Sequence, residues 1–301
     1  MRPGSLTLGL LTSTLTLLIT LPVQAGPEKK TGPSFSLQRS SSDGDKSDLK
    51  EQTILANIEN QKMIIELGDA TAPEFPLMVA ALADFYWDLS EVFFRKAHSD
   101  EIEDAIFDAE RTGNGQGLKK AKQRQRSLLA TQRSYQTQAV ETYRDVIDRF
   151  PSAKKIDEMR YYLGYHLGAM GRRGEAMEAF SDLLLKHPSS TYVPDALVNI
   201  GDYHFEENSY RDALEVYDRI QQYGDTAVKA YALYKTAWCQ YNLAAYDLAM
   251  DRLLSVIKLT KSQHEAGRRG AIDLMEEAQN ELVYPYSKIG KPGQAIAFFK
   301  K

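Results

Sequence analysis

Cysteine is nearly absent from this chain, since Cys239 is the single cysteine among 301 residues. One thiol cannot form an internal disulfide, so burial of apolar side chains has to hold the fold together. This composition suits a large helical protein better than a small disulfide-stapled module. We expect Cys239 itself to be a small buried apolar residue.

A strong net charge is also missing, because the formal charge at pH 7 is only −4. The chain has no excess of basic residues that would indicate nucleic acid as a partner. The patterns G-x-S-x-G, H-E-x-x-H and G-x-x-x-x-G-K-[ST] do not occur. The glycine-rich stretch 113–117 follows no predicted strand, so we interpret it as a turn.

Histidine is scarce and scattered, at positions 98, 166, 187, 204 and 264. These positions lack the cysteine or carboxylate spacing of a zinc site. We therefore predict no catalytic residue, no cofactor and no metal, and the sequence favours a protein that is not an enzyme.

The longest apolar run lies near the N-terminus, at residues 6–21, and five threonines dilute it. Its 16 residues are short for a membrane span, which needs about 20. Val23 and Ala25 stand at positions −3 and −1 of a cleavage site after Ala25. We predict that residues 1–25 are a secretory signal peptide and that the protein is periplasmic; an uncleaved anchor helix is the alternative.

Convincing strand patterns are absent from Leu49 onward, where small and large apolar residues recur instead at spacings of 12 and 4 residues. The four sets are Gly164, Ala176 and Phe180; Gly201, Ala213 and Tyr217; Ala237, Ala249 and Leu253; and Val283, Ala295 and Phe299. Successive sets are 37, 36 and 46 residues apart.

This spacing resembles the tetratricopeptide repeat family, in which each repeat is a pair of antiparallel helices. The resemblance implies an all-α fold, an α-solenoid of stacked helical hairpins, with tandem repeats over 152–301. We expect the small residue of each first helix to meet the alanine of the second helix, and the aromatic to fill the gap to the next repeat. The chain ends inside the last second helix, so we interpret the last repeat as truncated.

An earlier repeat over 76–151 is interrupted by an insertion. Ala139 and Tyr143 keep the four-residue spacing, and we identify Ala83 as the small residue that belongs with them. The separation between Ala83 and Ala139 is 44 residues longer than the 12-residue spacing of the later repeats. An acidic stretch (99–110) and a basic stretch (118–126) flank the breaker at 112–117. We predict a protruding helical hairpin, the extended arm 99–126, in which the acidic side faces the basic side; a solvated loop is the alternative.

Residues 26–47 are rich in Gly, Pro, Ser and charge, so we predict a disordered linker. Residues 48–70 follow as an amphipathic helix, with Ile54, Ile58 and Ile65 on one side. This helix is expected to cap the stack, or to pair with copies of itself through 49–67 and so allow oligomerisation.

In the tetratricopeptide repeat family the first helices line a concave groove, and aromatic residues dominate the corresponding positions here. We expect partner contact at Trp87, Tyr161, Tyr165, Asp202, Phe205, Tyr231, Tyr234, Trp238, Tyr241 and Tyr284. Tyr and Trp offer contact area at low entropic cost, and the few carboxylates suit a peptide that includes a basic residue. The alternative is that some of these aromatics only pack between repeats.

With the signal sequence, the chain resembles periplasmic scaffolds of Gram-negative envelopes, which serve outer-membrane assembly, Tol–Pal coordination or gliding motility. The resemblance implies a non-catalytic adaptor for envelope proteins or peptides, with no nucleic acid and at most indirect membrane contact. Two alternatives stay open: a peptidoglycan- or lipid-surface binding module that uses the basic arm, and the non-catalytic part of a longer enzyme.

Overall fold

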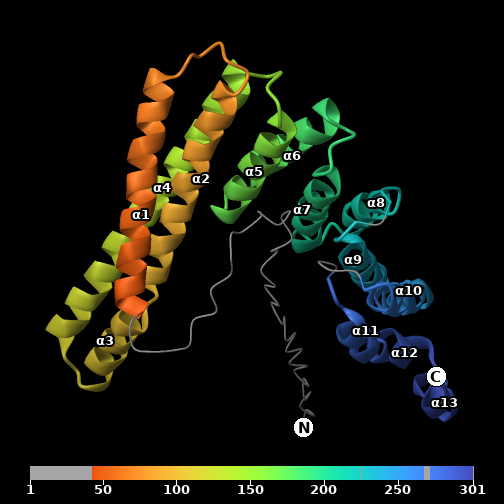
Figure 1. Ribbon diagram of the computed structural model, residues 1–301. Coiled ribbons are helices and arrows are strands. Elements are labelled where there is room, and N and C mark those ends of the chain that lie inside the picture. Colours follow the sequence, from red (N-terminus) through yellow and green to blue (C-terminus); the bar gives the residue numbers. More distant parts are fainter. Residues whose placement is uncertain (1–42, 225, 268–271, 301) are drawn as a thin grey trace, which may run out of the picture. The chain divides into compact units, whose positions relative to one another are not determined.

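The computed structural model describes residues 43–224, 226–267 and 272–300, and every regular element in these ranges is a helix (Figure 1). The predicted signal peptide, its cleavage site after Ala25, and most of the predicted linker lie outside the described residues, as does Lys301. No helix in the described part is long and apolar enough to cross a membrane.

Helix α1 (Asp43–Leu67) packs against α2 (Phe75–Ala97). Its apolar side faces α2, because Ile54 and Ile58 are buried there beside Leu82 and Leu89. Lys96 of α2 forms ion pairs with Asp48 and Glu51 near the start of α1. The helix begins five residues before the predicted position 48, and its contacts fit the capping role that the sequence suggests.

Helix α2 runs along α4 (Gly115–Arg149), and together they form the interrupted repeat. Ala83 and Ala139 are both fully buried. The Tyr143 hydroxyl donates a hydrogen bond to Asp84, as the Tyr217 hydroxyl does to Asp202 in a later repeat. These pairs are 59 and 15 residues apart, so the insertion is 59 minus 15, or 44 residues, as the sequence predicts.

The arm is helical, but it is not one uninterrupted hairpin. Helix α2 ends at Ala97, and a separate helix α3 (Asp100–Arg111) starts after the extended backbone of Ser99. Three carboxylates in the first turn of α3 favour a helix start there, because they complement the positive end of the helix dipole. The expected charge pairing is present: Lys122 lies 2.9 Å from Glu110, and Arg124 lies 2.6 Å from Glu101.

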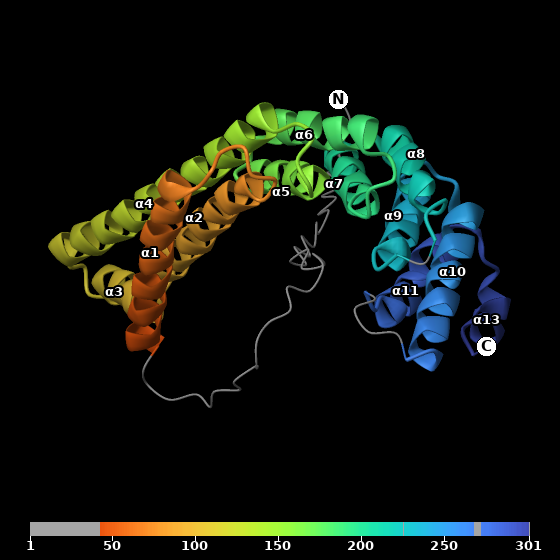
Figure 2. The same ribbon diagram turned by 45° about the horizontal axis from the view of Figure 1, so that its top comes forward.

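Three helix pairs follow along the chain: α5 (Ile156–Ala169) with α6 (Arg173–Lys186), α7 (Val193–Glu206) with α8 (Tyr210–Ile220), and α9 (Lys229–Asn242) with α10 (Tyr246–Glu265). The second helix of each pair packs on its own first helix and on the first helix of the next repeat. Figure 2 shows α5, α7 and α9 in one layer and α6, α8 and α10 in the other. The predicted all-α solenoid is confirmed.

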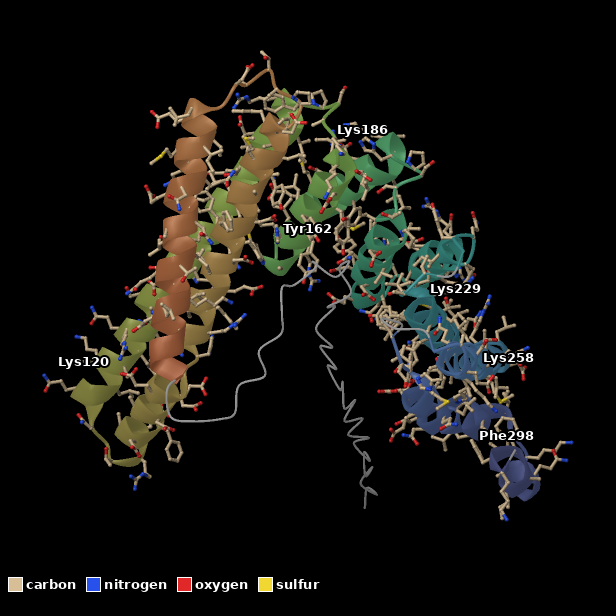
Figure 3. All side chains as sticks on the ribbon, viewed as in Figure 1. Lys120, Tyr162, Lys186, Lys229, Lys258 and Phe298 are labelled. Atoms are coloured by element: carbon tan, nitrogen blue, oxygen red, sulfur yellow. The ribbon has the colours of Figure 1, made fainter. Side chains whose placement is uncertain are left out.

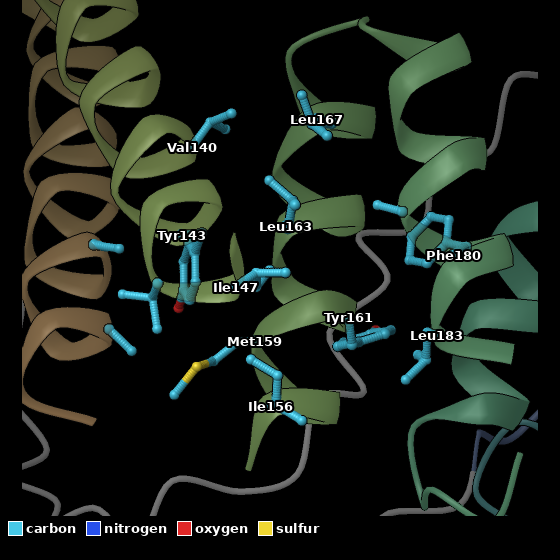
Figure 4. Close-up of a cluster of buried hydrophobic side chains, with 14 of the residues drawn as sticks. Val140, Tyr143, Ile147, Ile156, Met159, Tyr161, Leu163, Leu167, Phe180 and Leu183 are labelled. Atoms are coloured by element: carbon cyan, nitrogen blue, oxygen red, sulfur yellow. The ribbon is translucent and has the colours of Figure 1, made fainter. Parts of the chain in front are cut away.

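The small residues of the first helices make room for rings, and this corrects the expected pairing with alanine. A Cβ atom placed on Gly164 would lie 2.7 Å from the Phe180 ring, and one on Gly201 would lie 2.5 Å from the Tyr217 ring. Ala176 instead faces Gly168. Because the helices are antiparallel, four residues forward along α5 correspond to four residues back along α6. Figure 4 shows Phe180 in the core between these helices.

The first half of the last repeat is divided into α11 (Met275–Glu281) and α12 (Val283–Ile289), and only α11 keeps the predicted register. Ala196, Ala232 and Ala278 are fully buried at steps of 36 and 46 residues, which match the predicted steps. The expected packing of Val283 and Phe299 is wrong, because they are 49% and 45% exposed.

Its second helix explains that exposure. After a 3-10 turn at Pro292–Gln294, α13 (Ala295–Phe299) has only five residues, and none of them is buried. Ala295 is half-buried. The rings of Phe298 and Phe299 lie 4.7 and 5.1 Å from the Tyr286 ring instead of filling a gap beside Val283.

Candidate functional site

The first-helix face, as we use the term, consists of the ten aromatic and acidic positions predicted to contact a partner, on α2, α5, α7, α9 and α12. The structure sorts them by exposure. Tyr161 is buried at 3% exposure, Tyr284 is open at 50%, and the other eight side chains are half-buried. The aromatic stripe is therefore partly core and partly surface.

At the junction of α2 and α5, Trp87 stacks on His166 with ring centroids 3.8 Å apart and an interplanar angle of 26°. His166 is 4% exposed, so one face of the indole is covered by the chain itself. Tyr165 follows on the same helix and remains half-buried. Trp87 thus joins two repeats and leaves part of its ring at the surface.

Tyr161 corrects the prediction of a partner contact, because its ring belongs to the core between α5, α6 and the start of α7. Its centroid lies 6.0 Å from Phe180 and 5.1 Å from Tyr192, which precedes α7. The helix position alone pointed this side chain outward, but Tyr192 covers it. Burial raises the pKa of Tyr161 well above the usual value.

Asp202 joins α7 to α9. Its carboxylate accepts a hydrogen bond from Tyr217 and bonds of 3.1 and 3.0 Å from the Tyr231 hydroxyl, and it pairs with Lys235 at 3.0 Å. The Lys235 ammonium also lies 3.9 Å from the Phe205 ring centroid. The Asp202 carboxylate, predicted to contact a partner, is therefore already bonded to residues of the same chain.

Lys235 is a residue that the sequence reasoning missed, because the face was assigned no Lys or Arg. Its side chain is only 16% exposed. A lysine one helical turn after Tyr231 is the signal that could have found it, since such residues share a helix face.

Glu281 was also missed, and it joins α9 to α11. The Tyr234 hydroxyl donates to Oε1 of Glu281, and Nε1 of Trp238 donates to Oε2, both at 2.8 Å. Burial raises the pKa of Glu281, while these two hydrogen bonds oppose the rise. Both oxygens of this carboxylate are thus used within the chain.

A shallow surface hollow, with room for about one water molecule, lies beside this contact. Its apolar floor includes Ala237 and Leu253, and its rim includes Trp238, Tyr241 and Tyr284. The Trp238 ring centroid lies 5.5 Å from that of Tyr241 and 5.9 Å from that of Tyr284. The geometry offers a shallow apolar and aromatic surface to another molecule.

Residues suited to metal binding do not gather in the described part of the chain. No cluster of three or more His, Cys, Asp or Glu residues there could hold a metal ion. Cys239 is fully buried, and burial raises the pKa of its thiol to about 12, which disfavours the reactive thiolate.

Comparison with known proteins gives one family match, to the tetratricopeptide repeat, over residues 231–259. A similar solved structure is described as the crystal structure of BtubC (BKLC) from P. vanneervenii; it is 13% identical, with 72% of this chain and 92% of that chain covered, at a TM-score of 0.39. No curated protein matches the chain. The matched residues span most of α9 and most of α10, so one helix pair of this all-α solenoid matches the tetratricopeptide repeat.

Proposed function

We propose that this chain is a non-catalytic scaffold that binds protein partners through the first-helix face. The hollow rimmed by Trp238, Tyr241 and Tyr284 carries the proposal, because it combines an apolar floor with two half-buried aromatic rings and one exposed ring. Tyrosine and tryptophan in such pockets supply much of the affinity of protein interfaces. The match to the tetratricopeptide repeat lies over the same helices, and such repeats generally mediate protein–protein contacts.

The proposed location is the periplasm of a Gram-negative envelope. The N-terminal sequence supports it, because the apolar run at 6–21 is followed by Val23 and Ala25 at positions −3 and −1 of the predicted cleavage site. Outer-membrane assembly, Tol–Pal coordination and gliding motility are the processes that such a scaffold would serve. Sequencing of the N-terminus of the protein from a periplasmic extract tests the location: we expect Gly26 as the first residue, and an intact Met1 would contradict it.

Co-purification tests the binding face. Tyr284→Ala removes a ring that is half exposed, so we expect the chain to fold and to recover much less partner from cells than the parent protein does. Leu254→Ala is the matched control, since Leu254 is 41% exposed on α10, in the other layer. Equal recovery with all three proteins would contradict the proposal.

The alternative that the basic arm binds a peptidoglycan or lipid surface has less support. Glu110 and Glu101 of α3 already pair with Lys122 and Arg124 of α4. Lys119, Lys120 and Arg126 remain exposed, and Figure 3 shows Lys120 near the end of α4 that lies beside α3. Replacement of these three by glutamine would abolish sedimentation with vesicles or sacculi if the arm were the contact.

A further inference from the structure

Helices α5 and α7 carry an excess of negative charge. Their sequences contain five carboxylates and one arginine: Asp157, Glu158, Asp195, Asp202, Glu206 and Arg160. The arginine does not offset the carboxylates of its own layer, because Arg160 is 7% exposed and bonds at 2.9 Å to Asp182 of α6. Compensation for the five carboxylates has to come from other elements.

Four of the five carboxylates have a partner outside their own helix, which is a cation for three of them and a hydroxyl for the fourth. Glu158 pairs with Lys155 at 3.0 Å, Asp202 pairs with Lys235 at 3.0 Å, and Glu206 pairs with Arg173 at 2.6 Å. Asp157 accepts a hydrogen bond of 2.6 Å from the Ser190 hydroxyl. Asp195 differs from all four, because among the described residues no cation lies within ion-pair distance of its carboxylate and no other residue donates a hydrogen bond to it.

Asp195 is half-buried in the first turn of α7, beside the aromatic rings of α5. Asp195 stands three residues after Tyr192, the N-cap residue of α7, so the two side chains share a helix face. Burial and then the nearby carboxylates of Glu158, Asp84 and Asp195 raise the pKa of Tyr162 to about 12. The Tyr162 ring is half-buried and lies 6.1 Å from the Tyr192 ring. Figure 3 labels Tyr162 on α5. A carboxylate and half-open tyrosine rings thus share one surface.

The free chain loses stability by keeping this charge unpaired. Burial without a compensating partner raises the pKa of Asp195 to about 6, so the ionised form is disfavoured by the fold. Ionisable residues that destabilise the fold in this way are common at binding sites, where function requires them.

We propose that Asp195 and the rings of Tyr162 and Tyr192 receive a Lys or Arg side chain from a basic segment of the protein partner. The carboxylate supplies the opposite charge, and the ring faces attract a cation that lies over them. Among the described residues, the cations that lie over aromatic rings face Phe150, Phe205 and Tyr231, and none faces Tyr162 or Tyr192. The inference rests on the proposed function and adds the chemistry of the partner.

Selection from a random library of 12-residue peptides on the full chain provides the probe. We expect the selected peptides to share a Lys or Arg at one position. The Kd of one such peptide, and of a twin with norleucine at that position, is then measured against the parent, Asp195→Asn and Glu178→Gln. Glu178 is exposed on α6 in the other layer, so the control makes the same charge change away from the site.

We expect Asp195→Asn to weaken the basic peptide about tenfold and to leave the norleucine twin unchanged, while Glu178→Gln changes neither Kd. Asp195→Asn should also unfold at a higher temperature than the parent at neutral pH, so misfolding would not explain the loss. Selected peptides without a shared basic residue, or equal Kd values for the parent and Asp195→Asn, would overturn the inference.

Tyr284→Ala separates the inference from the proposed function. Weaker binding by Tyr284→Ala together with full binding by Asp195→Asn would overturn the basic-residue inference and leave the proposed face intact. Full binding by both variants, or no selected peptide at all, would contradict both.

Discussion

Nε1 of Trp238 donates a hydrogen bond of 2.8 Å to Oε2 of Glu281, a residue 43 positions later and in the next repeat. Tyr231 bonds in the same way to Asp202 of the preceding repeat. Trp87 reaches the next repeat by stacking on His166. Aromatic residues of the first-helix face therefore hold neighbouring repeats together while part of each ring stays at the surface, so binding tests need variants whose stability is known.

Glu281→Ala should destabilise the fold. It would leave the Tyr234 hydroxyl and the Trp238 indole nitrogen half-buried without their acceptor, which costs about 1–3 kcal/mol. Chemical denaturation measures the difference. Glu276→Ala, at an exposed position of the same helix, is the control and should stay within about 0.5 kcal/mol of the parent. A loss of equal size in the control would contradict a stabilising role for the two hydrogen bonds that Glu281 accepts.

Gly201→Ala and Gly174→Ala should have opposite effects, although both replace a helical glycine. A Cβ atom on Gly201 would lie 2.5 Å from the Tyr217 ring, while a Cβ atom on Gly174 would meet nothing within 4 Å. Alanine favours a helix over glycine by about 1 kcal/mol, so Gly174→Ala should gain stability. Gly201→Ala should lose about 1–3 kcal/mol through overpacking. Stabilisation by both substitutions in thermal unfolding would refute the close packing of glycine against the ring.

The stability of Asp195→Asn relative to the parent should depend on pH. Burial raises the pKa of Asp195 to about 6, above its ordinary 3.8 in the unfolded chain, so the fold favours the protonated acid. The stability of the parent therefore falls, relative to the variant, as pH rises through this window. We expect little pH-dependent difference at about pH 4 and up to about 3 kcal/mol more stability for the variant above about pH 7. A difference that is the same across the range would contradict the pKa assignment.

The docking of α3 should depend on apolar burial more than on its ion pairs. Ile102 is 2% exposed, whereas Arg124 and Glu101 are exposed side chains. Ile102→Ala should cost about 2–5 kcal/mol of local stability, and Arg124→Gln at most about 1 kcal/mol. Hydrogen exchange of the α3 amides measures both. A larger loss of protection in Arg124→Gln would reverse this ranking.

The spacing of Gly164, Ala176 and Phe180 was sufficient to predict paired helices and a solenoid, because small residues at regular intervals permit close helix packing. It did not identify which side chain each small residue meets, since that depends on how far two antiparallel helices are shifted along each other. The fully buried Ala278 keeps the 46-residue step, but Val283, on which that step was predicted, is exposed because a new helix begins there, and the ring contacts of Phe299 depend on a second helix of only five residues.

The candidate face was less predictable than the fold. Tyr161 was expected to contact a partner, but Tyr192 covers it, and Tyr192 lies on the connection before α7 rather than on a first helix. Lys235 and Glu281 belong to contacts between repeats that a single helix pattern does not reveal. The exposed Tyr284 was the easiest to predict, because its helix position alone turns it outward.

Site-specific photo-crosslinking on both layers tests the central claim most directly. A photoreactive residue is placed at Tyr284 or Tyr241 of the first-helix face, and at Lys186 of α6 or Lys258 of α10, which are exposed in the other layer. Binding through the first-helix face predicts one or more discrete crosslinked proteins from the first two positions and none from the last two. The same crosslinked proteins from Lys186 and Lys258, with none from Tyr284 and Tyr241, would contradict it.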